Sequence, residues 1–191
     1  MISENGAKLT MRLREPDDVI AFWREAGPEK WFARDDAFDA EIRARFLATH
    51  EAAARSELSD WEDTAEGAYA LLLVLDQFPR NLFRGSPRAF ATDAQALAVA
   101  ERAIARGFDD AFQPPERRFI YMPFMHAEDL AHQERCIALC AASGDAEGVK
   151  HAVTHRDIIR DFGRFPHRNT VLGRQTTAAE QEFLDEGGFR G

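Results

Sequence analysis

Two stretches of the chain place arginine and asparagine just after a Phe-Pro pair, one at residues 78–84 and one at residues 165–169. A guanidinium group offers a planar fork of donors to a carboxylate or phosphate, and an asparagine amide both donates and accepts hydrogen bonds. If the two stretches meet in the fold, they form a pocket that receives an anion. The predicted ligand-binding residues of these stretches are Arg80, Asn81, Arg84, Arg168 and Asn169.

Other side chains near these stretches could exchange protons with a bound molecule. Asp76 is placed by its neighbours in the last turn of a helix, where the helix dipole makes a carboxylate unfavourable unless a cation lies close to it. The two loop histidines, His126 and His167, can change charge near neutral pH. The candidate catalytic residues are therefore Asp76, His126 and His167, and the further candidate binding residues are Glu128 and His155.

The same residues have a structural interpretation. Arginines that bind carbonyl and carboxylate groups satisfy helix ends and hold loops in place as latches. In that case the chain is a protein-interaction scaffold, whose stacked helical hairpins offer a groove to a peptide and whose arginines hold a peptide carboxylate. The sequence leaves both functions open: a protein that binds a small anion, as an enzyme or without catalysis, and a scaffold.

Metal and thiol chemistry are less favoured. His151 and His155 have the i, i+4 spacing of two ligands on one helix face, but the glutamate of the HExxH motif is absent. His155 also shares a stripe with Ile159, which is typical of a half-buried structural histidine. Cys136 and Cys140 lie among apolar residues in the middle of a predicted helix, so we expect reduced, inert thiols. We assign no metal and no cofactor.

The elements that position these residues are predicted to be helices. Alanine, the best helix former, is abundant, and turn residues and caps separate the apolar stripes. The third predicted helix is apolar on all sides, which predicts a central position; we expect it to stop before Pro79, and the turns at Pro79 and Pro166 to meet beside it. The predicted helices begin near residues 16, 35, 62, 87, 128, 146 and 178.

The fold class that follows is all-α, with about seven helices in stacked hairpins, either as a tetratricopeptide-like superhelix or as an irregular bundle. The stretch 119–125 resembles a strand, but Pro123 interrupts it, and we expect a short segment that ends before this proline. We expect residues 11–191 to form a single helical domain and residues 1–10 to be a flexible N-terminal segment.

Charge and hydropathy exclude several classes of partner. The 191 residues carry a net charge of −9 with a pI of about 5.2, which disfavours binding to nucleic acid. The apolar runs are shorter than the roughly 20 residues of a membrane helix. The first ten residues lack the apolar core of a secretory signal, so we expect a cytoplasmic protein. The expected partner is an anionic small molecule or a peptide carboxylate.

Three runs of the sequence, residues 75–85, 122–130 and 162–169, resemble the signature blocks of an uncharacterised bacterial family, domain of unknown function 924. The resemblance extends over most of residues 16–184, and it implies a tetratricopeptide-like α fold without implying a reaction. One difference is Ala127, which stands where the family more usually has the serine of a His-Ser-Glu sequence. A serine in this block therefore has no chemical role in this chain.

Overall fold

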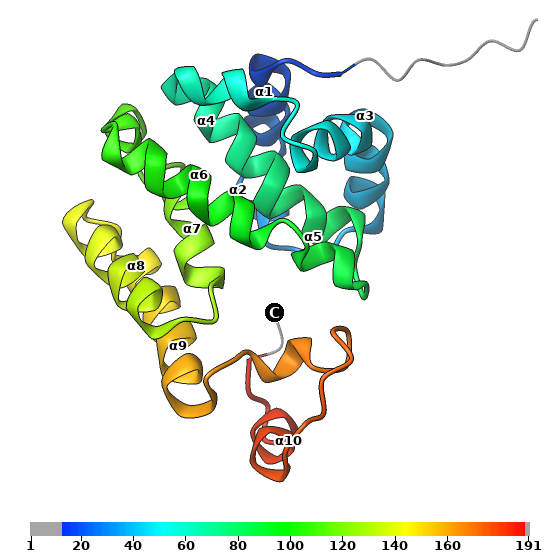
Figure 1. Ribbon diagram of the computed structural model, residues 1–191, viewed down its shortest axis with the longest axis vertical. Helices are drawn as coiled ribbons and strands as arrows, with labels where there is room; N and C mark the ends of the chain where they lie inside the picture. The colour runs from blue at the N-terminus through cyan, green and yellow to red at the C-terminus, as the bar shows by residue number, and fades with distance from the viewer. Residues whose placement is uncertain (1–12, 190–191) are drawn as a thin grey trace, which may run out of the picture.

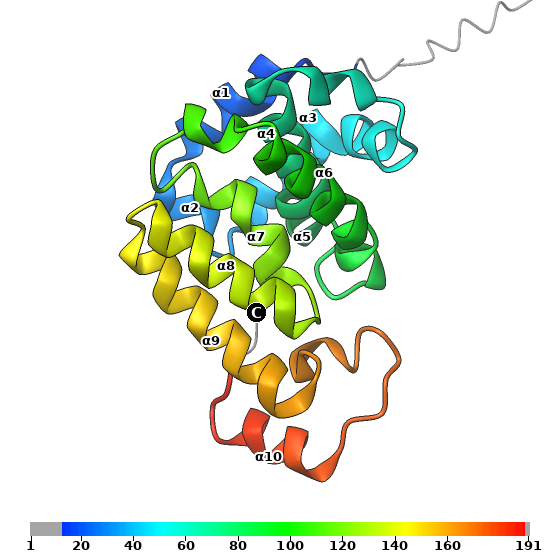
Figure 2. The ribbon, with the colours of Figure 1, turned by 60° about the vertical axis from the view of Figure 1, so that its left-hand side comes forward.

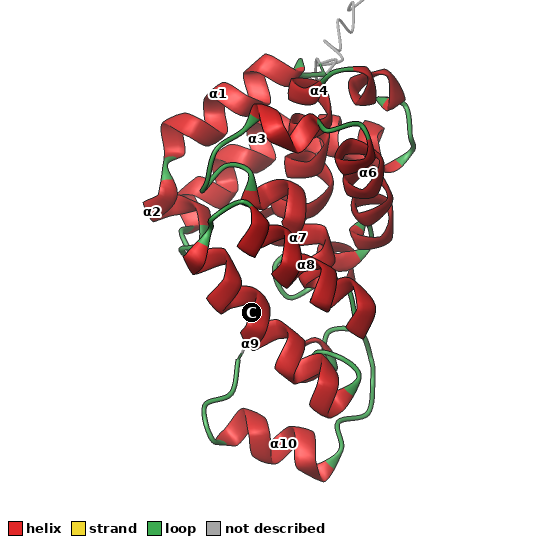
Figure 3. Ribbon diagram, turned by 90° about the vertical axis from the view of Figure 1, so that its left-hand side faces the viewer, coloured by secondary structure: helices red, strands yellow, loops and turns green. Residues whose placement is uncertain are grey.

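The computed structural model describes residues 13–189, and the regular elements of that range are all helical, as predicted (Figures 1 and 3). The expected flexible segment at residues 1–10 lies outside the described residues. The α-helices are α1 (Pro16–Ala26), α2 (Pro28–Trp31), α3 (Asp36–Ala54), α4 (Ala65–Leu72), α5 (Phe78–Leu82), α6 (Asp93–Ala105), α7 (Arg118–His126), α8 (Leu130–Ala142), α9 (Ala146–Phe162) and α10 (Ala178–Asp185).

Capping residues set several boundaries where the sequence predicts them. The Asp35 carboxylate accepts hydrogen bonds from the first turn of α3, and Asp145 accepts one from the amide of Gly148 in α9. Gly163, with a φ of +68°, ends α9 in the left-handed conformation that glycine adopts without strain. A capping box that begins at Thr177 opens α10.

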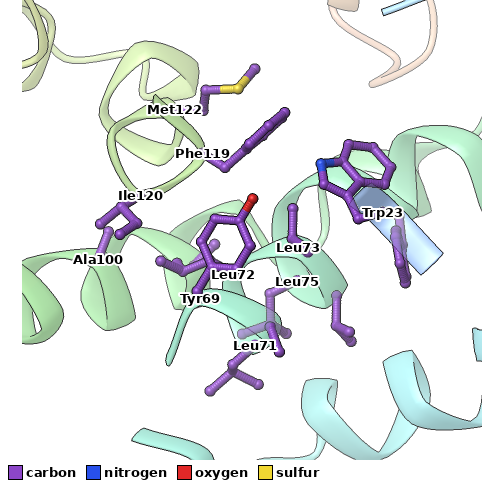
Figure 4. Packing of buried hydrophobic residues seen from close by; sticks show 14 of the residues in the cluster. Trp23, Tyr69, Leu71, Leu72, Leu73, Leu75, Ala100, Phe119, Ile120 and Met122 are labelled. Carbon is purple, nitrogen blue, oxygen red and sulfur yellow. The ribbon is translucent and has the colours of Figure 1, made fainter. Parts of the chain in front are cut away.

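The predicted central helix is confirmed, and its core is shown in Figure 4. Tyr69 and the run 71–75 are buried, and α4 packs against α1, α6 and α7. Trp23 of α1 and Phe119 of α7 lie face to edge, with ring centres 5.4 Å apart. The α8–α9 hairpin packs against α7, and α10 lies at the opposite end of the molecule from α1 (Figures 1 and 2).

The expectation that the central helix stops before Pro79 is wrong. Phe78 has α-helical dihedral angles, with φ −58° and ψ −38°, and the chain passes from α4 through a π-helical segment, Leu73–Gln77, directly into α5. The Phe78 amide bonds to the Leu73 carbonyl, five residues back instead of four. This wider turn lets Pro79 stand in the first turn of α5, where its missing N–H group costs least.

His50 of α3 and Thr92, the residue before α6, satisfy the carbonyl groups that the proline leaves open. Pro79 cannot donate to the carbonyls four and five residues before it, which belong to Leu75 and Val74. The Thr92 hydroxyl donates to the Leu75 oxygen at 2.5 Å, and His50 Nδ1 lies 2.9 Å from the Val74 oxygen. Burial lowers the pKa of His50, so its neutral ring donates this bond.

We expect Thr92→Val to lower the free energy of unfolding by about 1–3 kcal/mol, because it leaves the buried Leu75 carbonyl without a donor while the shape is kept. Urea denaturation measures this loss. The matched control is Thr154→Val, since the exposed Thr154 hydroxyl bonds only to a carbonyl of its own helix. The control should change the stability by less than about 0.5 kcal/mol, and equal losses would contradict the capping role of Thr92.

Two more expectations need correction. The segment predicted to end before Pro123 continues through it, because α7 includes this proline at its sixth position. Most residues of α7 are buried, and this burial offsets the roughly 3 kcal/mol that an interior proline costs. The helix predicted to begin near Pro87 is two elements, a 3₁₀ turn at Pro87–Phe90 and then α6. This break places Asp93 at the start of α6.

No helix in residues 13–189 has the length and apolar character that crossing a membrane requires. The α8–α9 hairpin agrees with the predicted hairpin of the fifth and sixth helices. The relation of this stack to tetratricopeptide superhelices stays a prediction.

Candidate functional site

The two Phe-Pro stretches, far apart in the sequence, meet in the fold as expected, and both contact a single carboxylate that was not predicted. Arg80 Nη2 lies 3.2 Å from Asp93 Oδ1, and Arg168 Nη1 lies 3.3 Å from Asp93 Oδ2. Arg80 belongs to α5, Asp93 begins α6, and Arg168 ends the 3₁₀ turn Pro166–Arg168. Asp93 thus joins the chain after the central helix to the chain after α9.

Behind this junction lies a buried pair of Asp76 and His126. The Asp76 Oδ1 atom is 2.8 Å from His126 Nδ1 and 3.4 Å from Arg80 Nη1. Asp76 stands in the π segment, and His126 is the last residue of α7. The side chain of Asp76 is 1% exposed, so its charge depends on these two partners.

The protonation states of this pair follow from its surroundings. Burial raises the pKa of Asp76, but the charge of Arg80 and the contact with His126 outweigh burial and lower this pKa to about 2. Burial and the charge of Arg80 lower the pKa of His126 more than Asp76 raises it. At neutral pH the carboxylate is therefore charged and the imidazole is neutral. We assign the proton to Nδ1, which donates to Asp76, so that Nε2 is a free acceptor.

Arg168 is buried between two aromatic rings. Its guanidinium carbon lies 4.6 Å from the centre of the Phe90 ring and 4.6 Å from that of Phe165, and the residue is 6% exposed. Burial lowers its pKa to about 10. Beyond the Nη1 bond to Asp93, neither Nε nor Nη2 has a hydrogen-bond partner among residues 13–189. Because Nε is shielded from solvent, Nη2 is the donor available to a ligand or to water.

A cavity of about 390 Å³ lies beside these residues, between the start of α6, the end of α7 and the 3₁₀ turn. Its charged or titratable lining consists of Asp93, His126, Glu128 and Arg168. The remaining wall is apolar and is formed by Pro87, Phe90, Ala91, Ala94, Leu97, Pro123, Ala127 and Leu172. Three of the predicted site residues, His126, Glu128 and Arg168, therefore face one cavity, and Asp76 and Arg80 support them from behind.

Glu128 connects the cavity to the C-terminal part of the chain. It accepts a hydrogen bond from the Phe165 amide at 2.9 Å and bonds from both terminal nitrogens of Arg174 at 2.6 and 3.0 Å. Burial raises the pKa of Glu128, but these bonds outweigh it and lower the pKa below its ordinary value. Glu128 is thus a charged wall of the cavity whose acceptors are already engaged.

The two other predicted histidines, His155 and His167, lie outside this lining. Both rings pack between Phe165 and Phe189, with ring centres 4.6–5.7 Å apart. Burial lowers the pKa of each to about 4. His155 Nδ1 lies 2.8 Å from the His151 carbonyl oxygen. Residues 13–189 contain no group of three or more His, Cys, Asp or Glu side chains arranged to hold a metal ion.

The three remaining predicted residues are paired with carboxylates elsewhere. Asn81 donates to Asp39 at 2.7 Å, and Arg84 binds the same carboxylate with two nitrogens. Asn169 donates to Glu180 at 3.2 Å. Within the described range these three side chains do not line the cavity. Their contacts are those expected of structural latches.

Asp93 and Phe90 are site residues that were not predicted from the sequence. The single helix predicted from residue 87 places Asp93 inside a helix instead of at its start. The signal that could have found it is Thr92-Asp93, since a threonine before an acidic residue is typical of a helix start. A helix that starts there has the Asp93 carboxylate at its N-terminus.

Comparison with known proteins identifies a family. The model described as "Bacterial protein of unknown function (DUF924)" matches residues 19–188. The solved structure of a protein of unknown function from Agrobacterium tumefaciens is similar, with 49% sequence identity, a TM-score of 0.87 and coverage of 90% of this chain and 97% of that chain. No curated protein matches the chain. The family resemblance stated from the sequence is confirmed, and the chain belongs to the DUF924 family of bacterial proteins.

Proposed function

We propose that the cavity binds a small anionic molecule, which Arg168 holds and with which His126 exchanges a proton. The observation that carries this proposal is the state of Arg168, a buried cation in the cavity wall with two guanidinium nitrogens unpartnered among residues 13–189. Both arginines bury an unpartnered Nε, but Arg174 engages both terminal nitrogens, as a latch does, whereas Arg168 engages only Nη1. Arg168 therefore has its Nη2 donors left for a ligand.

The Asp76–His126 pair supplies the proton chemistry. Asp76 accepts from Nδ1, which fixes the ring orientation and leaves Nε2 as the acceptor. The neutral ring can take up a proton at Nε2, Asp76 stabilises the resulting imidazolium, and the imidazolium can give this proton to a bound molecule. General acid–base assistance of this kind accelerates a reaction by about 10²–10⁴-fold. The volume of about 390 Å³ suits a metabolite-sized ligand.

A second candidate function is the interaction scaffold. The observation that favours it is the pairing of Asn81, Arg84 and Asn169 with carboxylates of the chain itself. In this function the arginines and asparagines hold the helices together, and no small anion stabilises the fold.

A thermal-shift titration with inorganic phosphate, sulfate, butyrate and benzoate at constant ionic strength separates the two functions. An anion at about 100 times its Kd adds about 2.7 kcal/mol to the stability, which raises the Tm of a chain of this size by roughly 5–10 °C. The Arg160→Met variant removes one exposed surface charge and is the control for nonspecific effects of charge. Its Tm should rise as much as that of the wild type. If none of the anions raises the Tm, the binding function is wrong and the scaffold is favoured.

A further inference from the structure

The charges around the cavity are balanced before any ligand binds. Three guanidinium groups meet three carboxylates in direct contacts, all within residues 13–189. These pairs are Arg80 with Asp76 and Asp93, Arg168 with Asp93, and Arg174 with Glu128. An anion that enters this partly buried space adds a negative charge for which residues 13–189 hold no spare cation at the site, and burial of an uncompensated charge is costly.

His126 is the cavity-lining group that can supply the missing positive charge. The other ionisable groups of the lining, Asp93, Glu128 and Arg168, are already engaged in ion pairs. The Nδ1 atom of His126 is engaged by Asp76, so a second proton would go to Nε2. Several charged or titratable groups, contributed by the elements packed against His126, surround its ring. They are Asp76, Arg80, Asp93, Glu128, His155, His167 and Arg168.

We propose that the ligand is a monoanionic carboxylate and that it binds together with one proton, which His126 holds. This inference rests on the proposed function. One proton balances one negative charge, whereas a dianion leaves a negative charge uncompensated beside Asp93 and Glu128. The apolar wall around Phe90 and Leu97 receives the organic part of the acid.

The pH dependence of binding follows from this coupling. Without a ligand, burial and Arg80 lower the pKa of His126, and a bound carboxylate raises it again. Because the complex holds one proton more than the free protein, affinity falls as pH rises. By linkage the fall is about tenfold for each pH unit between the two pKa values.

Calorimetric titration with benzoate between pH 6 and 8.5, in two buffers of different ionisation enthalpy, measures the protons taken up. We expect about one proton per benzoate and an affinity for sulfate at least about tenfold weaker, as charge balance requires. His126→Gln should abolish the proton uptake. The control His132→Gln, which changes a half-buried histidine of α8 outside the cavity, should retain it.

The outcomes separate this inference from the function on which it rests. If no anion binds, the proposed function is wrong. If benzoate binds without proton uptake, if sulfate binds more tightly, or if His126→Gln retains the uptake, the binding function stands and this inference is overturned. If His126→Gln does not fold, two measurements on the wild type still test the inference. They are the proton uptake from the two buffers and the ratio of the affinities for benzoate and sulfate.

Discussion

Replacement of Asp76 by alanine is expected to lower the free energy of unfolding by about 3–5 kcal/mol, because it leaves a buried site with an uncompensated charge. Arg80 loses one of its two carboxylates, and His126 loses the acceptor of its Nδ1–H group. Gln77, whose amide donates to Asp76, is left without that bond as well. Urea denaturation at pH 7 measures the loss.

The pH dependence of this loss has a definite sign. The folded pKa of Asp76 is about 2 and lies below the unfolded value of about 3.9, so the stability it contributes is present above pH 4 and declines as pH falls towards 2. Glu62→Ala, which removes the half-buried partner of the exposed Arg102, is the control and should cost about 0–1 kcal/mol. A loss for Asp76→Ala no larger than that of the control would contradict the account.

Replacement of Arg168 by methionine should leave the free energy of unfolding unchanged or raise it by up to about 2 kcal/mol. Burial lowers the pKa of Arg168 to about 10, so folding disfavours its charged form. Methionine keeps apolar contact with Phe90 and Phe165, and Asp93 keeps its bonds to Arg80. A residue retained at a cost in stability is typical of a functional site.

The comparison variant for this prediction is Arg80→Met. Arg80 binds both Asp76 and Asp93, and this removal should cost about 3–5 kcal/mol because Asp76 stays buried. Chemical denaturation of both variants under one condition distinguishes the roles. If Arg168→Met loses as much stability as Arg80→Met, Arg168 is a structural latch and the prediction is wrong.

Much of the fold could be predicted because its signals are local. Caps such as Asp35 and Thr177 and the left-handed Gly163 fix helix ends through hydrogen bonds to their near neighbours. The meeting of the two Phe-Pro stretches could also be predicted, since an apolar central helix brings the chain at its end into the interior. The family resemblance supported the same all-α fold.

The rest depends on contacts between distant residues. Pro79 does not end its helix, because His50 and Thr92 satisfy the carbonyls that the missing N–H group of this proline leaves open. Pro123 stays helical because α7 is buried on most sides. Asp93 belongs to the site because Arg80 and Arg168 both bind it. The spacing of these residues along the sequence does not predict that contact.

The most direct test of the central claim is the affinity of wild type and Arg168→Met for benzoate, titrated calorimetrically at pH 6.5. The account predicts at least about a 30-fold loss in the variant, which corresponds to about 2 kcal/mol for a charge pair that loses one partner. Equal affinity in the two proteins would contradict it, because the anion would then bind without the one buried guanidinium that faces the cavity within the described chain.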